Sequence, residues 1–281
     1  MDLDFVEACV SPNFPKNWRK GKELGSGAFG KVFLVIDDDD PSDEKFVVKE
    51  VEIDKVYKDR NQEINELKAL VQIKHKGITP FYGFHPLKDT LLIFLQYRHL
   101  GSIAKRIERD GCLQEEIVRN YTRQILDALN YLHTRNPPII HRYIKGRNIL
   151  LVDETNIEIT DFGISKVLSS QTNARSQVGT INYMAPEIVL GEKTTPYSVK
   201  ADIWSVGCTV VEMITKYPPF HGMRDDEIFS ALKNAEPLNY TLPNDASGDL
   251  KSFLSKTFQT DIQHRPTAQQ LLSEDQFLKL N

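Results

Sequence analysis

The pattern of apolar residues changes near Gly101, and this change limits the fold more than any other feature of the sequence. Before Gly101, short apolar runs separated by polar loops are typical of strands. After it, apolar residues recur at helical spacing over residues 115–135, and residues 198–216 are apolar on most sides, as in a buried helix. We therefore predict an α+β fold with a small β-rich part and a larger helical part. The expected strands are KVFLVI (31–36), KFVVKEV (45–51) and TLLIFLQY (90–97), and QEINELKALVQI (62–73) is an expected helix.

The composition argues against several classes of protein. The 281 residues carry a formal net charge of −4, which provides no basic field for a nucleic-acid backbone. No apolar run reaches the roughly 18 residues that a membrane span needs, and the acidic start MDLDFVEACV is unlike a secretory signal. Cys9, Cys112 and Cys208 lie far apart without a CxxC pair, so neither a zinc site nor a disulfide framework is indicated. We expect a cytoplasmic protein with no nucleic-acid partner and no membrane span.

A glycine-rich segment, GSGAFGKV, contains Gly25, Gly27 and Gly30. The GxGxxG pattern alone is a weak signal, because a flexible turn has the same composition. Here the residues that follow the glycines have the pattern of a strand. A glycine loop between two strands fits a flap over nucleotide phosphates. Lys49 follows in the next strand, and Glu63 near the start of the expected helix is its candidate ion-pair partner; Glu66 is the alternative.

Two later segments supply candidate metal ligands. Asn148 belongs to IIHRYIKGRNILL (139–151), and Asp161 belongs to the following ITDFGISK. A DFG triplet alone is most often a turn, but its position after an asparagine-containing loop makes it specific. Both side chains offer hard oxygen donors of the kind that Mg²⁺ prefers.

The order of the motifs is more specific than any single one. GTINYMAPE (179–187), DIWSVGC and HRP (264–266) follow the segments above in that order. From Trp18 to about Leu278, the chain resembles a eukaryotic protein kinase domain of the serine/threonine type. IKGRNILL, GTxxYMAPE, KADIWSVGCTVVEM and YPPF are similar to the branch of MAP-kinase-kinase-kinases, the STE-like kinases.

The resemblance implies a bilobal fold that binds ATP and Mg²⁺ and transfers the γ-phosphoryl group to serine or threonine of a protein. Residues 1–17 would be an N-terminal extension, 18–95 the N-lobe, and 96–281 the hinge and C-lobe. A MAP kinase kinase is the implied kind of protein substrate, and activation would come from an upstream kinase or from autophosphorylation.

The resemblance also implies roles for individual residues. Lys49 would hold the α- and β-phosphates and be held by Glu63, while Lys145 would neutralise the γ-phosphate. Asn148 and Asp161 would bind Mg²⁺. The implied ATP-binding residues are Leu24, Gly25, Gly27, Gly30, Val32, Lys49, the gatekeeper Leu95, and the hinge residues Gln96, Tyr97 and Arg98.

Regulatory and structural roles are implied as well. In the expected activation loop, Ser176 is the best candidate for a phosphorylation switch, although serines also simply make loops soluble. A phosphate there could pair with Arg142, and Thr180 would help to dock the acceptor residue. Glu187 would pair with Arg265. Leu67, Phe81, Phe162 and His141 would stack as a regulatory spine anchored by Asp202.

Tyr143 is the one departure from the family pattern in these motifs. It follows His141 and Arg142, where the resemblance requires an aspartate that accepts the proton of the substrate hydroxyl. A phenol with a pKa near 10 is a poor base at neutral pH, and its bulk occupies the place of the acceptor. We therefore expect strongly reduced transfer with nucleotide binding retained.

Three hypotheses account for this tyrosine. The chain is a natural pseudokinase that acts as a scaffold or allosteric partner, a natural or introduced variant of an active kinase, or a kinase that keeps weak activity through another group. The other motifs are intact, and this favours an otherwise competent kinase template.

Overall fold

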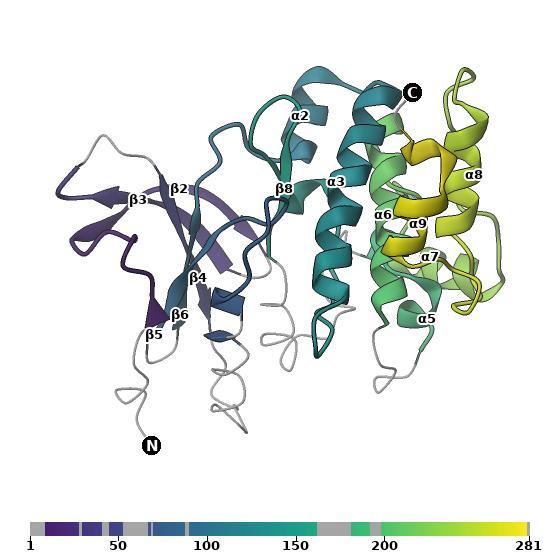
Figure 1. Ribbon diagram of the computed structural model, residues 1–281. Helices are drawn as coiled ribbons and strands as arrows, with labels where there is room; N and C mark the ends of the chain where they lie inside the picture. The colour runs from purple at the N-terminus through teal and green to yellow at the C-terminus, as the bar shows by residue number, and fades with distance from the viewer. Residues whose placement is uncertain are drawn as a thin grey trace. The chain divides into compact units, whose positions relative to one another are not determined.

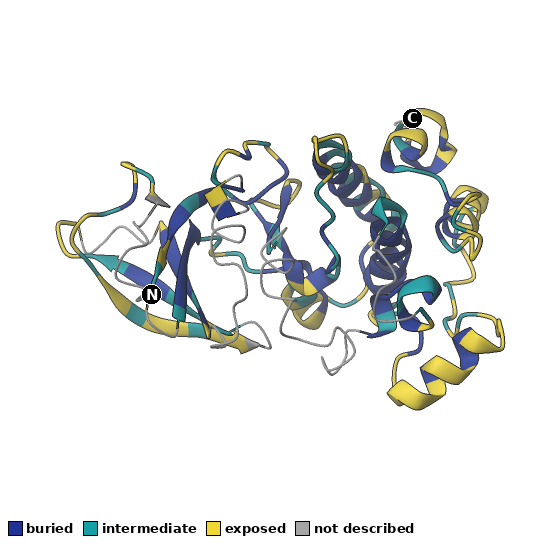
Figure 2. Cartoon of the chain, turned by 90° about the horizontal axis from the view of Figure 1, so that it is seen from below, coloured by how far each residue is buried: buried dark blue, intermediate teal, exposed yellow. Residues whose placement is uncertain are grey.

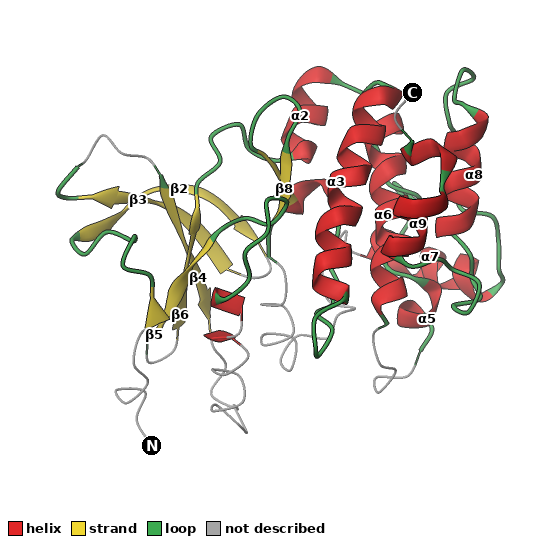
Figure 3. Cartoon of the chain, in the orientation of Figure 1, coloured by secondary structure: helices red, strands yellow, loops and turns green. Residues whose placement is uncertain are grey.

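A computed structural model describes residues 9–27, 30–40, 45–52, 67–68, 70–87, 90–161, 181–191 and 198–279. The chain divides into two compact units (Figure 1). Unit 1 contains the described residues up to Lys74 and those of Thr79–His99. Unit 2 contains His75–Ile78 and the described residues of Leu100–Ser165 and Ala174–Asn281. Strands dominate unit 1 and helices dominate unit 2, so the predicted α+β fold class is confirmed (Figure 3).

The described strands of unit 1 form a six-stranded sheet in which neighbouring strands are antiparallel. The order across the sheet is β1-β5-β6-β4-β3-β2. The three predicted strands are confirmed as β3, β4 and β6. Within the predicted helix 62–73, residues 67–68 and 70–71 are helical, whereas residues 72–73 lie beyond the end of the helix. The strands are β1 (Cys9–Val10), β2 (Trp18–Gly27), β3 (Gly30–Asp37), β4 (Phe46–Glu52), β5 (Phe81–Pro86) and β6 (Thr90–Gln96).

The pairing of β4 with β6 divides the side chains of the sheet between two faces. Val48 lies opposite Phe94, whereas Lys49 lies opposite Ile93. Because successive residues of a strand point to opposite faces, Val48 and Phe94 share one face and Lys49 lies on the other. The first face carries an aromatic cluster, and the second carries the predicted phosphate-binding lysine.

Residues 9–17, which we call the N-terminal strap, cover the aromatic face. β1 pairs with β5 near one edge of the sheet, and the Asn17 carbonyl accepts the Asp38 N–H beyond β3 on the other side. Between these points, Phe14 is buried, with its ring centroid 4.3 Å from that of Phe94 and 5.1 Å from that of Phe46. Part of the segment predicted as an N-terminal extension therefore adds a strand and a core residue to unit 1.

Replacing Phe14 by alanine should destabilise unit 1 by about 3–5 kcal/mol, the usual cost of deleting a buried aromatic side chain. Urea unfolding followed by tryptophan fluorescence measures this, because Trp18 packs edge-on against Phe14 with a centroid distance of 5.9 Å. Leu87→Ala is the control, since Leu87 is an exposed apolar residue of the same unit. Equal unfolding midpoints for the two variants would contradict a structural role for the strap.

Unit 2 is built around two long helices, α3 and α6. The predicted helices over 115–135 and 198–216 are confirmed by them, and α6 is buried nearly all round, as its sequence indicated (Figure 2). Within the described ranges, none of the helices combines the length and apolar character that crossing a lipid bilayer requires. The elements are α2 (Ile103–Asp110), α3 (Glu115–His133), β7 (Ile149–Leu151), β8 (Ile157–Ile159), α5 (Pro186–Val189), α6 (Val199–Thr215), α7 (Asp225–Lys233), α8 (Gly248–Thr257) and α9 (Ala268–Glu274), with short 3-10 helices at Gly146–Asn148, Ile181–Tyr183 and Gln276–Leu278.

Candidate functional site

Asp202, a buried carboxylate in the first turn of α6, fixes the backbone of the HRY segment in unit 2. Its Oδ2 accepts the His141 N–H at 2.8 Å, and its Oδ1 accepts the Arg142 N–H at 2.7 Å. Burial alone would raise the pKa of Asp202, but the hydrogen bond from His133 and the nearby imidazoles hold it below its ordinary value. The ionised carboxylate thus stabilises Arg142 in the left-handed conformation (φ 73°), which non-glycine residues rarely adopt.

His141 links the HRY segment to the strand that leads to Asp161. Its Nδ1 accepts the Tyr143 N–H at 3.3 Å, and its Nε2 lies 2.9 Å from the Thr160 carbonyl oxygen. Since a carbonyl oxygen only accepts, Nε2 must carry the proton. Burial lowers the pKa of His141, so the ring is neutral and this tautomer is retained.

Tyr143 occupies the position predicted for the catalytic base. The residue is only 3% exposed, and burial raises the pKa of its phenol, while the charge of Arg142 opposes the rise. The Lys145 Nζ lies 5.9 Å from the centroid of the Tyr143 ring, within range of a cation–π contact. A phenol with a raised pKa remains protonated at neutral pH and is a very poor acceptor for the proton of a substrate hydroxyl.

Asn148 and Asp161, the predicted metal ligands, flank the β7–β8 hairpin. The Asn148 Nδ2 donates to the Tyr143 carbonyl oxygen at 2.9 Å, which fixes the amide and leaves its Oδ1 as the candidate donor to a metal. The Thr160 N–H donates to the Asn148 carbonyl oxygen at 2.9 Å, so the chain reaches Asp161 directly beside Asn148. Asp161 has a φ of 65°, another left-handed residue at the site.

The chemistry of these two donors fits a hard cation such as Mg²⁺. Both donate through hard oxygens, and no group of three or more His, Cys, Asp or Glu gathers around a possible metal in the described part of the chain. Mg²⁺ is commonly held by one or two carboxylates together with substrate phosphates and waters. Two protein ligands therefore suffice for a magnesium ion that arrives with a nucleotide.

Glu212 of α6 contacts the same loop, and sequence reasoning missed it; the available signal was an acidic residue near the end of a mostly apolar helix. Its Oε2 accepts the Gly146 N–H at 2.9 Å, and Tyr183 forms a hydrogen bond with the same carboxyl group. Burial raises the pKa of Glu212 despite these bonds. A Cβ on Gly146 would lie only 2.8 Å from Oε2, so a side chain at this position would displace the Glu212 carboxyl group. His133, which holds Asp202, was also missed, and no sequence signal pointed to it.

The glycines of the predicted phosphate flap differ in whether the surrounding structure leaves space for a side chain. A Cβ on Gly30 would lie 1.8 Å from the Glu50 carbonyl oxygen, and its φ is 109°, so the sheet itself requires glycine there. A Cβ on Gly25 would meet no atom within 4 Å. Among the described residues nothing excludes a side chain at Gly25, and a glycine at such a position suits the close approach of a ligand to the backbone.

Lys49 and the predicted hinge residues lie on the central strands of unit 1. Lys49 of β4 is buried and lies opposite Val32 of β3, which is also among the predicted ATP-binding residues. The Gln96 and Tyr97 N–H groups donate to the carbonyl oxygens of Pro80 and Lys45. An adenine contact from either residue would therefore use its carbonyl oxygen. Leu24 lies in β2, Leu95 is buried in β6, and Arg98 follows Tyr97 within the same unit.

Several predicted residues lie outside the described residues: Glu63 and its alternative Glu66, Phe162, Ser176 and Thr180. Their roles stay predictions. Leu67, Phe81 and His141 of the predicted spine are each buried. The predicted bridge between Glu187 and Arg265 is confirmed, with both Arg265 Nη atoms bonded to the carboxylate at 2.7 and 3.0 Å.

Comparison with known proteins decides the family. The model of the protein kinase domain family matches residues 18–277. The chain belongs to the protein kinase family. This kinase chain is 39% identical to human mitogen-activated protein kinase kinase kinase 3 over 277 residues, covering 94% of the chain and 42% of that relative.

Other relatives carry similar names. The kinase chain is 37% identical to mitogen-activated protein kinase kinase kinase YODA of Arabidopsis thaliana, covering 95% of the chain and 30% of the relative. It is 35% identical to serine/threonine-protein kinase STE11 of Saccharomyces cerevisiae, covering 96% and 43%. The predicted resemblance to this branch is thereby confirmed. The chain spans less than half the length of these relatives.

Proposed function

We propose that the chain is a serine/threonine protein kinase domain that binds ATP with Mg²⁺ and has strongly reduced phosphoryl transfer. The proposal rests on one contrast within unit 2. Asn148 is oriented as an oxygen ligand and Asp161 follows it across the hairpin, whereas the base position holds a buried, protonated phenol. The residues expected to bind the nucleotide are intact, and the residue expected to take the proton is not.

Each unit supplies its own part of this function. In unit 1, Lys49 would neutralise phosphate charge and Gly25 would let the backbone approach the phosphates, with the adenine at Leu95, Gln96, Tyr97 and Arg98. In unit 2, Asn148 and Asp161 would hold Mg²⁺, which when bound neutralises phosphate charge, and Lys145 would contact the γ-phosphate. We propose that unit 1 is the N-lobe and unit 2 the C-lobe, with the boundaries predicted from the sequence near residues 17 and 95.

The names of the relatives support a place in a MAP kinase cascade. We propose a MAP kinase kinase as the protein substrate, and an upstream kinase or autophosphorylation at Ser176 or Thr180 as the activating step. A cytoplasmic location stays a prediction.

A second candidate function is that of a pseudokinase, a nucleotide-binding scaffold or allosteric partner without transfer activity. The burial and raised pKa of Tyr143 favour it, because both act against any residual base. The two candidate functions use the same nucleotide site. In the first, Tyr143 alone accounts for the reduced activity; in the second, restoring a base at this position would not restore transfer.

Nucleotide binding is tested by thermal unfolding of the chain with ATP, in Mg²⁺ and in EDTA. A ligand at about 100 times its Kd stabilises by about 2.7 kcal/mol, or roughly 5–10 °C for a domain of this size. We expect that rise with Mg²⁺, and we expect Asp161→Asn to remove most of the effect of the metal. Asp226→Asn on the exposed surface of α7 is the matched control. No stabilisation by ATP and Mg²⁺ in the unaltered chain would contradict the proposed function.

A further inference from the structure

The β7–β8 hairpin sets the position of Asn148 relative to Asp161. Ile149 pairs with Ile159, and Leu151 pairs with Ile157. Asn148 directly precedes β7, and Asp161 follows β8 by two residues. Any change in how the two strands pair therefore changes the distance and orientation between the two candidate ligands.

The strands of this hairpin are too short to specify their own register. Each has three residues, and a slip by one residue would move a ligand by about 3.3 Å and turn its side chain to the other face. Neighbouring loops contact each strand separately: the Leu151 N–H donates to the Gly101 carbonyl oxygen and the Ile159 N–H to that of Gly77. The turn that joins the strands, residues 153–156, fixes one strand against the other at the closed end of the hairpin, and the bond from the Thr160 N–H to the Asn148 carbonyl oxygen does so at the open end.

Asp153 organises this turn from within. Its Oδ1 accepts from the Thr155 N–H and the Asn156 N–H, each at 2.8 Å, and from the Thr155 hydroxyl at 2.9 Å. Its Oδ2 accepts from the Asn156 side chain at 2.8 Å. These bonds, led by that from the Asn156 side chain, hold the pKa of Asp153 well below its usual range. The carboxylate is exposed to solvent, so these hydrogen bonds, and not packing by neighbouring side chains, hold the Asp153 side chain in this position.

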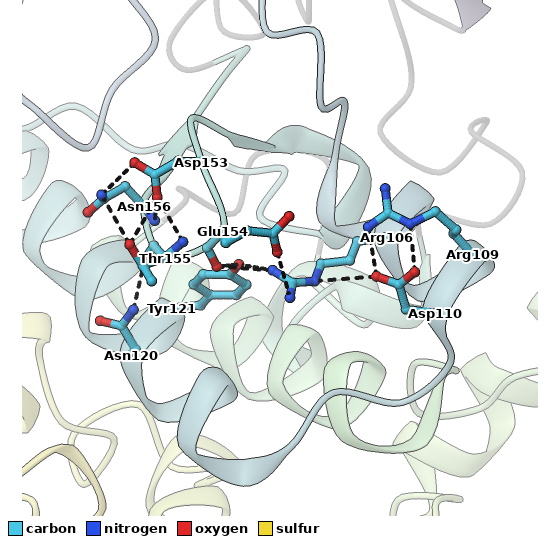
Figure 4. Close-up of polar contacts among 9 residues, drawn as sticks. All are labelled: Arg106, Arg109, Asp110, Asn120, Tyr121, Asp153, Glu154, Thr155 and Asn156. Carbon is cyan, nitrogen blue, oxygen red and sulfur yellow. Dashed lines mark hydrogen bonds and ion pairs between the residues drawn. The ribbon is translucent and has the colours of Figure 1, made fainter.

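Helices α2 and α3 hold the same turn from outside (Figure 4). The Thr155 carbonyl oxygen accepts from Asn120 at 2.8 Å and from Gln124 at 2.7 Å. The Glu154 carbonyl oxygen accepts from the Tyr121 hydroxyl at 2.7 Å and from Arg106 at 3.1 Å. Two carbonyl groups of a surface turn are thus each bonded twice to helices of the core of unit 2.

We propose that Asp153 is a positioning residue for the metal site: it fixes the β7–β8 turn and through the hairpin register places Asn148 and Asp161 for Mg²⁺. This inference rests on the proposed function. The network lies at the closed end of the hairpin and the candidate ligands lie at its open end, so Asp153 acts without touching the metal. Asn120 and Gln124 support the same placement from α3.

The test is the affinity of the chain for ATP, measured by calorimetry in Mg²⁺ and in EDTA. Asp153→Ala should weaken binding in Mg²⁺ by about 10–100-fold, the usual effect of losing a residue that orients metal ligands, and leave binding in EDTA unchanged. Asp153→Asn, which keeps one acceptor oxygen, should recover part of the loss. Asn120→Ala should act in the same direction with a smaller effect, and serves if Asp153→Ala folds poorly.

Asp261→Ala is the matched control, because Asp261 also caps an exposed turn, accepting the Gln263 N–H at 2.9 Å, but lies beyond α8. The Asp261→Ala variant should have a lower melting temperature but should still bind ATP more tightly in Mg²⁺ than in EDTA, as the unaltered chain does. If Asp153→Ala lowers the melting temperature and keeps the full effect of Mg²⁺, the inference is overturned and Asp153 is only structural. If the unaltered chain shows no Mg²⁺-dependent binding, the proposed function and the inference both fail.

Discussion

Replacing Tyr143 by aspartate should raise the rate of phosphoryl transfer by about 10²–10⁴-fold, the usual contribution of a positioned general base. Aspartate is ionised at neutral pH, whereas burial keeps the phenol of Tyr143 protonated. The hydrogen bonds that hold the backbone of the loop come from other side chains. Asp202 holds the backbone of His141 and Arg142, and Asn148 bonds to the carbonyl oxygen of Tyr143. The substituted loop should therefore keep its conformation.

The measurement is transfer of labelled phosphate from ATP to a generic protein substrate. Tyr143→Asn is the matched control: it has the size of aspartate without the base, so it separates relief of bulk from gain of a proton acceptor. Both variants remove a buried ring, so assays must run well below the melting temperature of the less stable one. If Tyr143→Asp stays as inactive as the unaltered chain, a single missing base is the wrong explanation and the pseudokinase is favoured. If Tyr143→Asn gains as much as Tyr143→Asp, bulk and not basicity is the obstacle.

The parts of the fold that the sequence predicted correctly are those whose apolar residues follow a regular period. β6 is a nearly continuous apolar run with its central residues buried, β4 begins with the apolar residues Phe46, Val47 and Val48, and α3 shows a clear apolar stripe. α6 is apolar on most sides because it lies in the core of unit 2. In these elements the burial of each residue follows from its neighbours in the chain, so the local apolar pattern is enough to predict the element.

The parts that the sequence did not predict depend on contacts between distant residues. β1 has only two residues, and Phe14 packs against the rings of Phe46 and Phe94, which lie 32 and 80 positions further along the chain. The bonds from α3 to the turn at Thr155 span 31 and 35 positions. No period marks such residues. For the same reason the sequence predicted Asn148 and Asp161 from their motifs but not the Asp153 network behind them.

Replacing Glu187 by alanine should destabilise unit 2 by about 3–5 kcal/mol, the usual cost of leaving a buried charge without its partner. The Arg265 side chain is fully buried, with both Nη atoms on the Glu187 carboxylate. Its other contacts among the described residues include the carbonyl oxygens of Lys200 and Gln259 and the ring of Trp204. These are dipoles and a ring face, which cannot neutralise a guanidinium cut off from water.

Urea unfolding of Glu187→Ala, Glu187→Gln and Glu187→Ala/Arg265→Met measures this cost and its origin. Glu187→Gln keeps an acceptor oxygen and should cost less than alanine. The double variant should be more stable than Glu187→Ala, because removing both charges also removes the desolvated cation. Asp226→Ala is the surface control: its partner Arg224 is well exposed, so we expect a change within about 0.5 kcal/mol. A similarly small change for Glu187→Ala would mean that water reaches Arg265 once the carboxylate is gone, and the bridge would then fix local geometry without being a large source of stability.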